Sequence, residues 1–118
     1  MKLLTDCLIL FVALEHVGFL VIEMFLWRTP VVRKNFGMSE QLAQDSYVLA
    51  MNQGLYNGFL AAGLAWGWAT GQPNVVTFFL GCVVVAGVFG GATAKASIFF
   101  IQALPAAIAL GLAVWGPR

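Results

Sequence analysis

The sequence predicts an all-helical integral membrane protein, a single domain built as a bundle of four transmembrane helices. Hydrophobic residues make up 61% of the 118 residues and charged residues only 9%, whereas soluble domains carry roughly 25% charged residues. Four apolar segments approach the length of about 20 residues that a helix needs to cross a bilayer. None of them alternates in the pattern of about ten residues that marks a barrel strand. The composition therefore excludes a soluble globule and favours helices.

The four predicted spans follow one another with short connections. They cover residues 3–27, 47–69, 75–92 and 96–115. The third is the shortest, close to the lower limit of roughly 17 residues, and its many β-branched residues are tolerated in membrane helices.

The segment 28–46 is the one sizeable connection. Pro30 is expected to stop the first helix, and Gly37 marks a turn. Ser39 followed by Glu40 predicts an N-cap, so the second helix is expected to begin about two turns before the membrane.

The distribution of basic residues predicts the orientation. Lysine and arginine fall mainly on the side of the first and third connections, with fewer at the termini: Arg28, Arg33, Lys34 and Lys95 against Lys2 and Arg118. The positive-inside tendency then predicts cytoplasmic connections with both termini outside. The formal charge of +1 and the lack of a basic run exclude a nucleic-acid surface.

Three ionisable residues lie inside the first predicted span. Glu15, His16 and Glu23 fall within an arc of about 100° on a helix, so they share one face. An ionisable group at mid-membrane costs about 2.5–3.5 kcal/mol on insertion scales. These side chains are therefore expected to face protein or water and not lipid.

Polar residues on two other spans are expected to face this cluster. They are Asn52, Gln53, Tyr56 and Asn57 on the second span and Gln102 on the fourth. A depth count at about 1.5 Å per residue places Glu23 level with Asn52, Gln53 and Gln102, and His16 level with Asn57. The sequence thus predicts a polar pocket with Arg28, Arg33, Lys34 and Lys95 around its mouth. The alternative is a satisfied hydrogen-bond network that only fixes helix register.

Glycine pairs predict close helix packing. Gly54 with Gly58, Gly63 with Gly67, and Gly87 with Gly91 have the small-xxx-small spacing that lets helix backbones approach. Pro105 is expected to kink the fourth span just after Gln102, because it cannot donate a backbone hydrogen bond.

Three blocks of the sequence carry a family resemblance: "ALEHVGFLVIEMFLW" with the following "TP" and "RK", then "NQGLYNGFLAAGL", then "FIQALPA". Together they resemble the bacterial membrane-protein family catalogued as domain of unknown function 1304. The resemblance spans nearly the whole chain and implies a four-span inner-membrane protein. It brings no activity and no catalytic residues.

Four functions are consistent with these residues. The first is a binder of a small molecule or lipid, or a proton-linked transporter, using Glu15 and Glu23 with His16 as relay; a carboxylate in a low-dielectric site is easier to protonate than in water. The second is an enzyme acting on a lipid or isoprenoid with His16 and a carboxylate as acid and base.

The third function is a metal site, which is disfavoured because Glu15 and His16 diverge by about 100° and Glu23 lies two turns away. The fourth is an accessory subunit or homodimer whose glycine faces bind partner helices. The sequence implies no particular cofactor.

Overall fold

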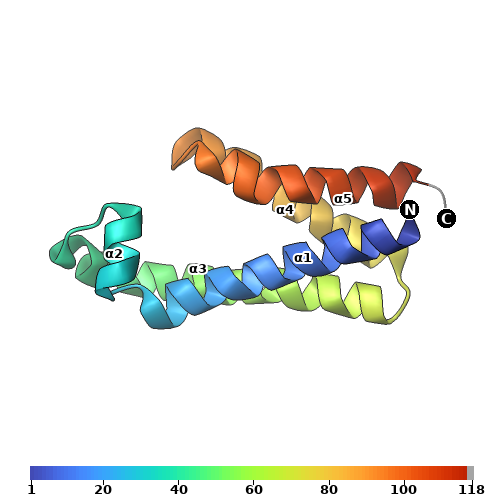
Figure 1. Ribbon diagram of the computed structural model, residues 1–118. Coiled ribbons are helices and arrows are strands. Elements are labelled where there is room, and N and C mark those ends of the chain that lie inside the picture. The colour runs from blue at the N-terminus through green and yellow to red at the C-terminus, as the bar shows by residue number, and fades with distance from the viewer. Residues whose placement is uncertain (117–118) are drawn as a thin grey trace. The chain divides into compact units, whose positions relative to one another are not determined.

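The computed structural model describes residues 1–116; Arg118, which entered the charge count, lies outside them. The described residues contain helices and no strand (Figure 1). In chain order the elements are α1 (Lys2–Val21), η1 (Ile22–Leu26), α2 (Pro30–Phe36), α3 (Glu40–Ala69), α4 (Pro73–Thr93), η2 (Phe99–Ala103) and α5 (Leu104–Trp115), where η1 and η2 are single π-helical turns. The all-helical prediction is confirmed.

The chain divides into two compact units. One contains Met1–Leu14 and the chain from Leu60 onward, and the other is Glu15–Phe59. We call them the terminal unit and the hairpin unit. Each is described by itself below.

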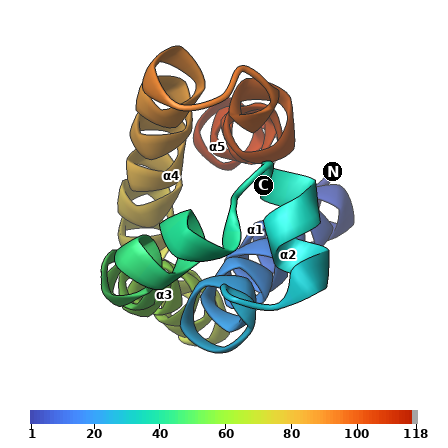
Figure 2. The same ribbon diagram turned by 90° about the vertical axis from the view of Figure 1, so that its left-hand side faces the viewer.

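The terminal unit has a hydrophobic core to which four helices contribute. Its buried residues come from α1, α3, α4 and α5: Ile9, Val12, Ala13, Leu64, Val76, Leu80, Val83, Ala106 and Ala109. α4 and α5 lie side by side (Figure 2). A Cβ on Gly87 would lie 2.9 Å from the backbone nitrogen of Ala103, so α4 contacts η2 at a point where only glycine fits.

The hairpin unit is formed by the end of α1, η1, α2 and the first part of α3. The Ser39 hydroxyl accepts a hydrogen bond from the backbone N–H of Leu42 at 3.0 Å. This is the predicted cap, and α3 begins at Glu40 as expected. Gly37 ends α2 in the left-handed conformation, with φ of 64°.

Pro30 was predicted to stop the first helix, but it also begins the next one. The first helix ends at Leu26, and Pro30 occupies the first turn of α2, where its fixed φ and missing N–H are tolerated. Thr29 caps this helix, because its hydroxyl accepts a hydrogen bond from the N–H of Val32. The connection is therefore largely helical.

The expected kink at Pro105 takes the form of a π-helical turn. η2 immediately precedes α5, and the N–H of Leu104 bonds to the carbonyl of Phe99, five residues earlier. Pro105 has no N–H and cannot donate a backbone hydrogen bond, and the wider π-helical turn accommodates the absence of this bond.

The glycine pairs pack against side chains of the same unit. A Cβ on Gly54 would lie 2.6 Å from Met24 Cγ, and one on Gly58 would lie 2.7 Å from Leu20 Cδ1. At the other two pairs the space that a Cβ would take is also occupied. The neighbour is Phe79 at Gly63, Val75 at Gly67, Ala103 at Gly87 and Phe99 at Gly91. These glycines therefore pack closely against neighbouring segments of the chain, as predicted.

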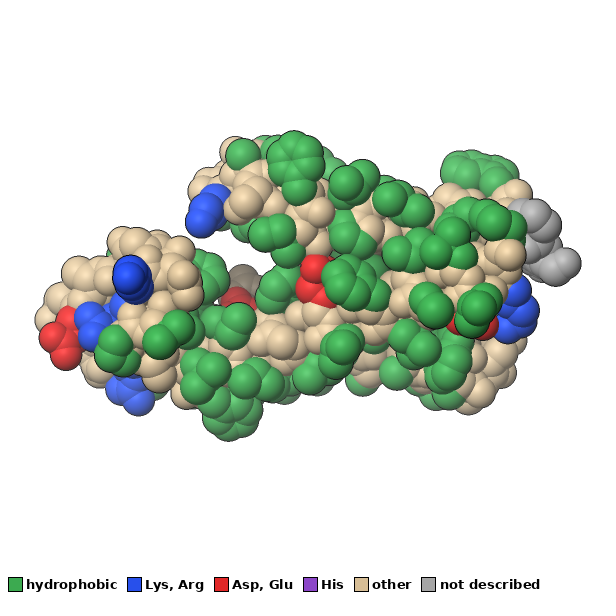
Figure 3. Space-filling view, in the orientation of Figure 1, with side chains coloured by type: hydrophobic (Ala, Val, Ile, Leu, Met, Phe, Trp, Pro, Cys, Tyr) green, Lys and Arg blue, Asp and Glu red, His purple; other side chains and the backbone are tan. Residues whose placement is uncertain are grey.

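Two helical segments are long and apolar enough to cross a membrane, Lys2–Leu26 and Pro73–Thr93. Phe99–Trp115 is apolar but shorter. α3 has the length, at 30 residues, but not the hydropathy, because amide side chains interrupt it. Hydrophobic side chains cover much of the visible surface along α1 and α5 (Figure 3). The four-span topology remains a prediction.

Candidate functional site

Glu23 and Asn57 form the one direct side-chain hydrogen bond that the structure shows between predicted site residues. The amide Nδ2 of Asn57 donates to Glu23 Oε1 at 2.5 Å. Glu23 lies in the π-helical turn η1, and Asn57 lies on α3. π-helical turns within α-helices occur frequently at functional sites, so this pair is the starting point for the candidate site.

The depth count placed Asn57 about one turn too far from Glu23. The structure sets the Cβ of Glu23 next to Gly54, at 3.1 Å from where a Cβ would stand, while its carboxylate reaches Asn57. Helical side chains tilt toward the N-terminus of their own helix. Since the two helices run antiparallel, the tilts converge, and residues offset by about a turn meet. A count based on Cα positions alone misses this offset.

The other amides and Tyr56 do not join the pair. Asn52 Nδ2 donates to the carbonyl of Val48 on its own helix at 2.9 Å. Gln53 and Tyr56 are exposed, and the Tyr56 ring lies 6.2 Å from that of Phe59. Gln102 belongs to the terminal unit, where its Nε2 donates to the carbonyl of Val83 at 3.3 Å. The structure therefore does not show the predicted contact of Asn52 or Gln53 with Glu23.

His16 and Glu15 are enclosed to different degrees. His16 is fully buried, and its ring meets Phe19 edge to face at 5.2 Å. Glu15 is half-buried, and its Oε1 is enclosed without a hydrogen-bond partner in the structure. Neither residue lines the two cavities described below.

A cavity of about 370 Å³ opens beside Glu23 in the hairpin unit. We call it the η1 pocket. It is lined by η1, the residues that follow it and α3: Glu23, Met24, Phe25, Trp27, Arg28, Thr29, Tyr47 and Met51. One acid, one base, three aromatic rings and two methionines thus share one pocket. The lining thus combines hydrophobic and aromatic side chains with polar and charged groups, and small-molecule sites are built from both kinds.

Two contacts hold the basic end of the η1 pocket. The guanidinium carbon of Arg28 lies 4.2 Å from the centre of the Tyr47 ring, and its Nη1 donates to Gln44 Oε1 at 3.1 Å. Trp27 Nε1 donates to Ser46 Oγ at 3.0 Å. Because these partners lie within a single turn of α3, they hold the residues that follow η1 against that helix.

Of the four basic residues predicted at the pocket mouth, Arg28 lines the η1 pocket. Arg33 and Lys34 lie in the last turn of α2 and are not part of its lining. Lys95 belongs to the terminal unit. The predicted ring of four cations is therefore represented in this pocket by a single arginine.

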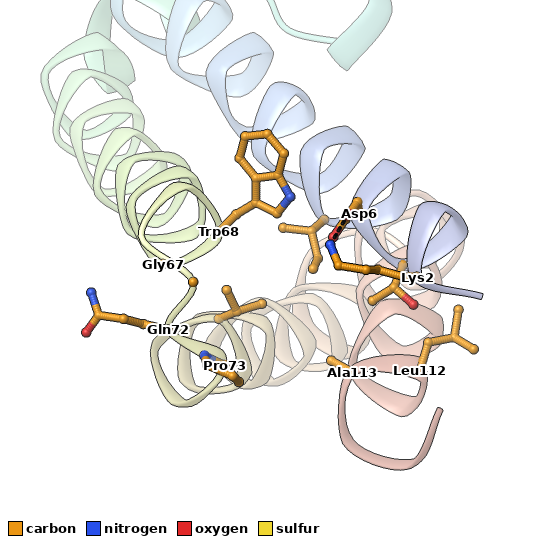
Figure 4. Close-up of a pocket in the computed structure, with 12 residues that line it drawn as sticks. Lys2, Asp6, Gly67, Trp68, Gln72, Pro73, Leu112 and Ala113 are labelled. Carbon is orange, nitrogen blue, oxygen red and sulfur yellow. Dashed lines mark hydrogen bonds and ion pairs between the residues drawn. The ribbon is translucent and has the colours of Figure 1, made fainter. Parts of the chain in front are cut away.

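The terminal unit has its own cavity, of about 300 Å³, which we call the terminal pocket. Trp68 extends toward α1, where Lys2 and Asp6 form an ion pair at 2.9 Å (Figure 4). Gln72 and Pro73 lie where the turn after α3 leads into α4. Because Lys2 and Asp6 neutralise each other, this pocket presents no uncompensated charge to a ligand.

The residues described by the structure include no group of three or more His, Cys, Asp or Glu side chains placed to hold a metal ion. Glu15 and Glu23 are on the same helix as His16, but only Glu23 lines the η1 pocket.

The sequence analysis missed the aromatic residues and methionines of the η1 pocket. Trp27 and Tyr47 stand at the ends of two predicted spans, where an aromatic residue ordinarily anchors a helix at the membrane interface. For Trp27 the available signal was the adjacent Arg28, because an arginine next to an interfacial aromatic residue can stack on it. Tyr47 lies far from Arg28 in sequence and had no such signal. Met24 and Met51 gave no signal apart from their hydrophobicity.

Comparison with known proteins agrees with the resemblance noted in the sequence. The chain is 30% identical over 114 residues to the uncharacterised protein YpaA of Lactococcus lactis subsp. lactis (strain IL1403), covering 93% of this chain and 96% of that protein. No solved structure matches. The family model described as protein of unknown function DUF1304 matches residues 10–114. The chain therefore belongs to the DUF1304 family.

Proposed function

We propose that this chain is a four-span protein of the bacterial inner membrane that binds a small molecule in the η1 pocket. The observation that carries the proposal is the pocket itself, in which Glu23 and Arg28 share a cavity of about 370 Å³. A ligand site usually has a volume of about 300–1,000 Å³, so the size is appropriate for a small organic molecule or part of a lipid.

Four spans are proposed from length and exposure. Only 22% of the most apolar window of Lys2–Leu26 and of Pro73–Thr93 is buried inside the structure, whereas the core helix of a soluble protein is mostly buried. α3, at 30 residues, would extend about 45 Å, and a bilayer core is about 30 Å thick. η2 and α5 together would supply the fourth span, with both termini outside.

The topology can be tested with single cysteines in a background lacking Cys7 and Cys82. A cysteine at Asn35 in the first connection is expected to react with a membrane-impermeant maleimide only after the cells are opened. A cysteine at Gln72 in the second connection is expected to react in intact spheroplasts. Both positions are exposed. Labelling of both positions from the same side would refute four spans.

The binding proposal can be tested by ligand-induced thermal stabilisation of the purified protein in detergent. A panel of amphiphiles that differ in charge should include at least one that raises the melting temperature of the wild type. Met51→Trp, which fills the η1 pocket, should abolish this shift. Leu49→Trp is the matched control, because Leu49 is exposed on the same helix outside the pocket. Equal shifts in Met51→Trp and Leu49→Trp would refute the site.

A proton-linked transport cycle is the finer form of this proposal, and it rests on the carboxyl group of Glu23 in the pocket and that of Glu15 nearer the N-terminus of α1. Glu23→Gln or Glu15→Gln is expected to abolish proton-coupled flux of a stabilising ligand in liposomes. Flux unchanged in both variants would restrict the function to binding. The hypothesis of an acid and base centred on His16 receives no support from the two cavities, since His16 lines neither.

A further inference from the structure

We infer that the η1 pocket is selective for an amphiphile with an anionic headgroup, a carboxylate or phosphate on an apolar chain, and that Arg28 binds the headgroup. This inference rests on the proposed function, because it names the class of ligand for the same pocket. Three observations support it: the free hydrogen-bonding capacity of Arg28, the separate partners of the two charges on α3, and the apolar side chains in the lining of the pocket.

Arg28 is held in place but retains donors for an oxyanion. A guanidinium group has five N–H donors, and the structure shows Nη1 used by Gln44. No carboxylate of the described residues forms an ion pair with Arg28, so its charge is not neutralised within that part of the chain. The Tyr47 ring covers one face of the guanidinium group and leaves its edge for a planar, bidentate contact with a carboxylate or phosphate.

The presence of Glu23 in the same pocket suggests a zwitterionic ligand, but the geometry argues against a small one. The carboxylate is bonded to Asn57 and the guanidinium group to Gln44. These two partners are 13 residues apart on α3, which corresponds to roughly 20 Å of helix rise. The reach of the side chains shortens this separation, but the two charges remain bonded to different ends of this stretch of α3. A small zwitterion could therefore not reach both groups.

Three apolar side chains share the lining with the two charged residues. They are Met24, Phe25 and Met51, and methionine side chains adapt well to flexible hydrocarbon chains. The Asn57 amide already satisfies one oxygen of Glu23, so that end of the pocket does not need a cationic ligand. An acyl or isoprenoid chain along these side chains, with its anionic head on Arg28, matches the lining.

Trp27 lines the pocket and provides an internal reporter for the test. In a background in which Trp66, Trp68 and Trp115 are replaced by Phe, brominated ligands quench Trp27 only when they come close to it. Dibromostearate, added to the protein in maltoside micelles, is expected to quench saturably. Its half-saturating concentration should be at least tenfold lower than that of dibromostearyl alcohol, which has the same chain without the charge.

Variants isolate the role of Arg28. Arg28→Gln should remove the tenfold preference for the acid, whereas Lys34→Gln, which deletes the same charge on α2 outside the pocket, should keep it.

Nanodiscs with brominated phosphatidylglycerol or brominated phosphatidylcholine distinguish the source of the headgroup. Quenching by phosphatidylglycerol that depends on Arg28 identifies a bilayer lipid, and quenching by dibromostearate alone identifies a free single-chain anion; both support the inference.

Two results would overturn it. If the alcohol quenches as strongly as the acid, or Arg28→Gln keeps the preference, the pocket binds chains without selecting for anions, and the proposed binding function survives. If no brominated chain quenches Trp27, the amphiphile class is wrong, and the stabilisation panel with Met51→Trp decides the proposed function separately. The comparison of acid with alcohol uses intact Arg28, so it does not depend on the folding of the Arg28 variant.

Discussion

Replacing Gly54 by alanine tests the packing that sets Glu23 against α3. The added Cβ would stand 2.6 Å from Met24 Cγ, 3.1 Å from Glu23 Cβ and 3.2 Å from the carbonyl oxygen of Leu20. The first distance is shorter than any ordinary contact, and the third is to backbone. α3 and the end of α1 must therefore move apart to accept the methyl group.

The size of the effect follows from two opposing terms. Alanine gains up to about 1 kcal/mol over glycine in a helix interior, and overpacking of a well-packed site costs about 1–3 kcal/mol. Gly18→Ala is the matched control, because a Cβ on Gly18 meets nothing within 4 Å. This variant therefore gains the helix propensity of alanine without the cost of overpacking. The two variants should therefore differ in free energy of unfolding by about 1–3 kcal/mol, with Gly54→Ala the less stable.

The measurement is reversible unfolding in mixed micelles with increasing fractions of sodium dodecyl sulfate, followed by circular dichroism. Comparing the midpoints of Gly54→Ala and Gly18→Ala at equal slope gives the difference directly. Equal midpoints would show that α3 and the end of α1 are not in contact at Gly54, and the position of Glu23 would then have to be reconsidered.

Three further substitutions give contrasting outcomes in the same unfolding assay. Asn57→Ala should destabilise by about 1.5–3 kcal/mol, because it removes a hydrogen bond to the carboxyl group of Glu23; a change within error would show that the bond contributes nothing. Gly87→Ala should cost about 1–3 kcal/mol, because its Cβ would meet the backbone of η2, and a stabilised variant would contradict that contact. Lys2→Ala should change stability by less than about 1 kcal/mol, since its ion pair with Asp6 is exposed; a larger loss would mean that the pair has a structural role.

The helices were predictable because their signals are local. The Ser39 cap and the left-handed Gly37 depend on residues within one turn, and both were predicted and observed. The π-helical turns were not predictable in the same way. η2 compensates for Pro105, so a kink could be expected there but not its form. η1 contains no proline or glycine, and nothing in its sequence distinguishes it from an ordinary turn.

The candidate site was predictable in part. An unfavourable carboxylate in an apolar span pointed to Glu23, and an amide on the second span was a suitable partner. The identity of this amide depended on the tilt of the side chains on the two antiparallel helices. Because of this tilt Glu23 bonds to Asn57, while Asn52 bonds to the backbone of its own helix. Tyr47 and Met51 enter the pocket through the register between α3 and η1, which no local pattern encodes.

The central claim is that the η1 pocket holds a small molecule. The most direct measurement is the intact mass of the protein released from its own membrane under non-denaturing conditions. Wild type and Leu49→Trp are expected to carry an additional bound mass that is absent from Met51→Trp. Identical spectra for the wild type and Met51→Trp, both with or both without a bound molecule, would contradict the claim that this pocket is the binding site.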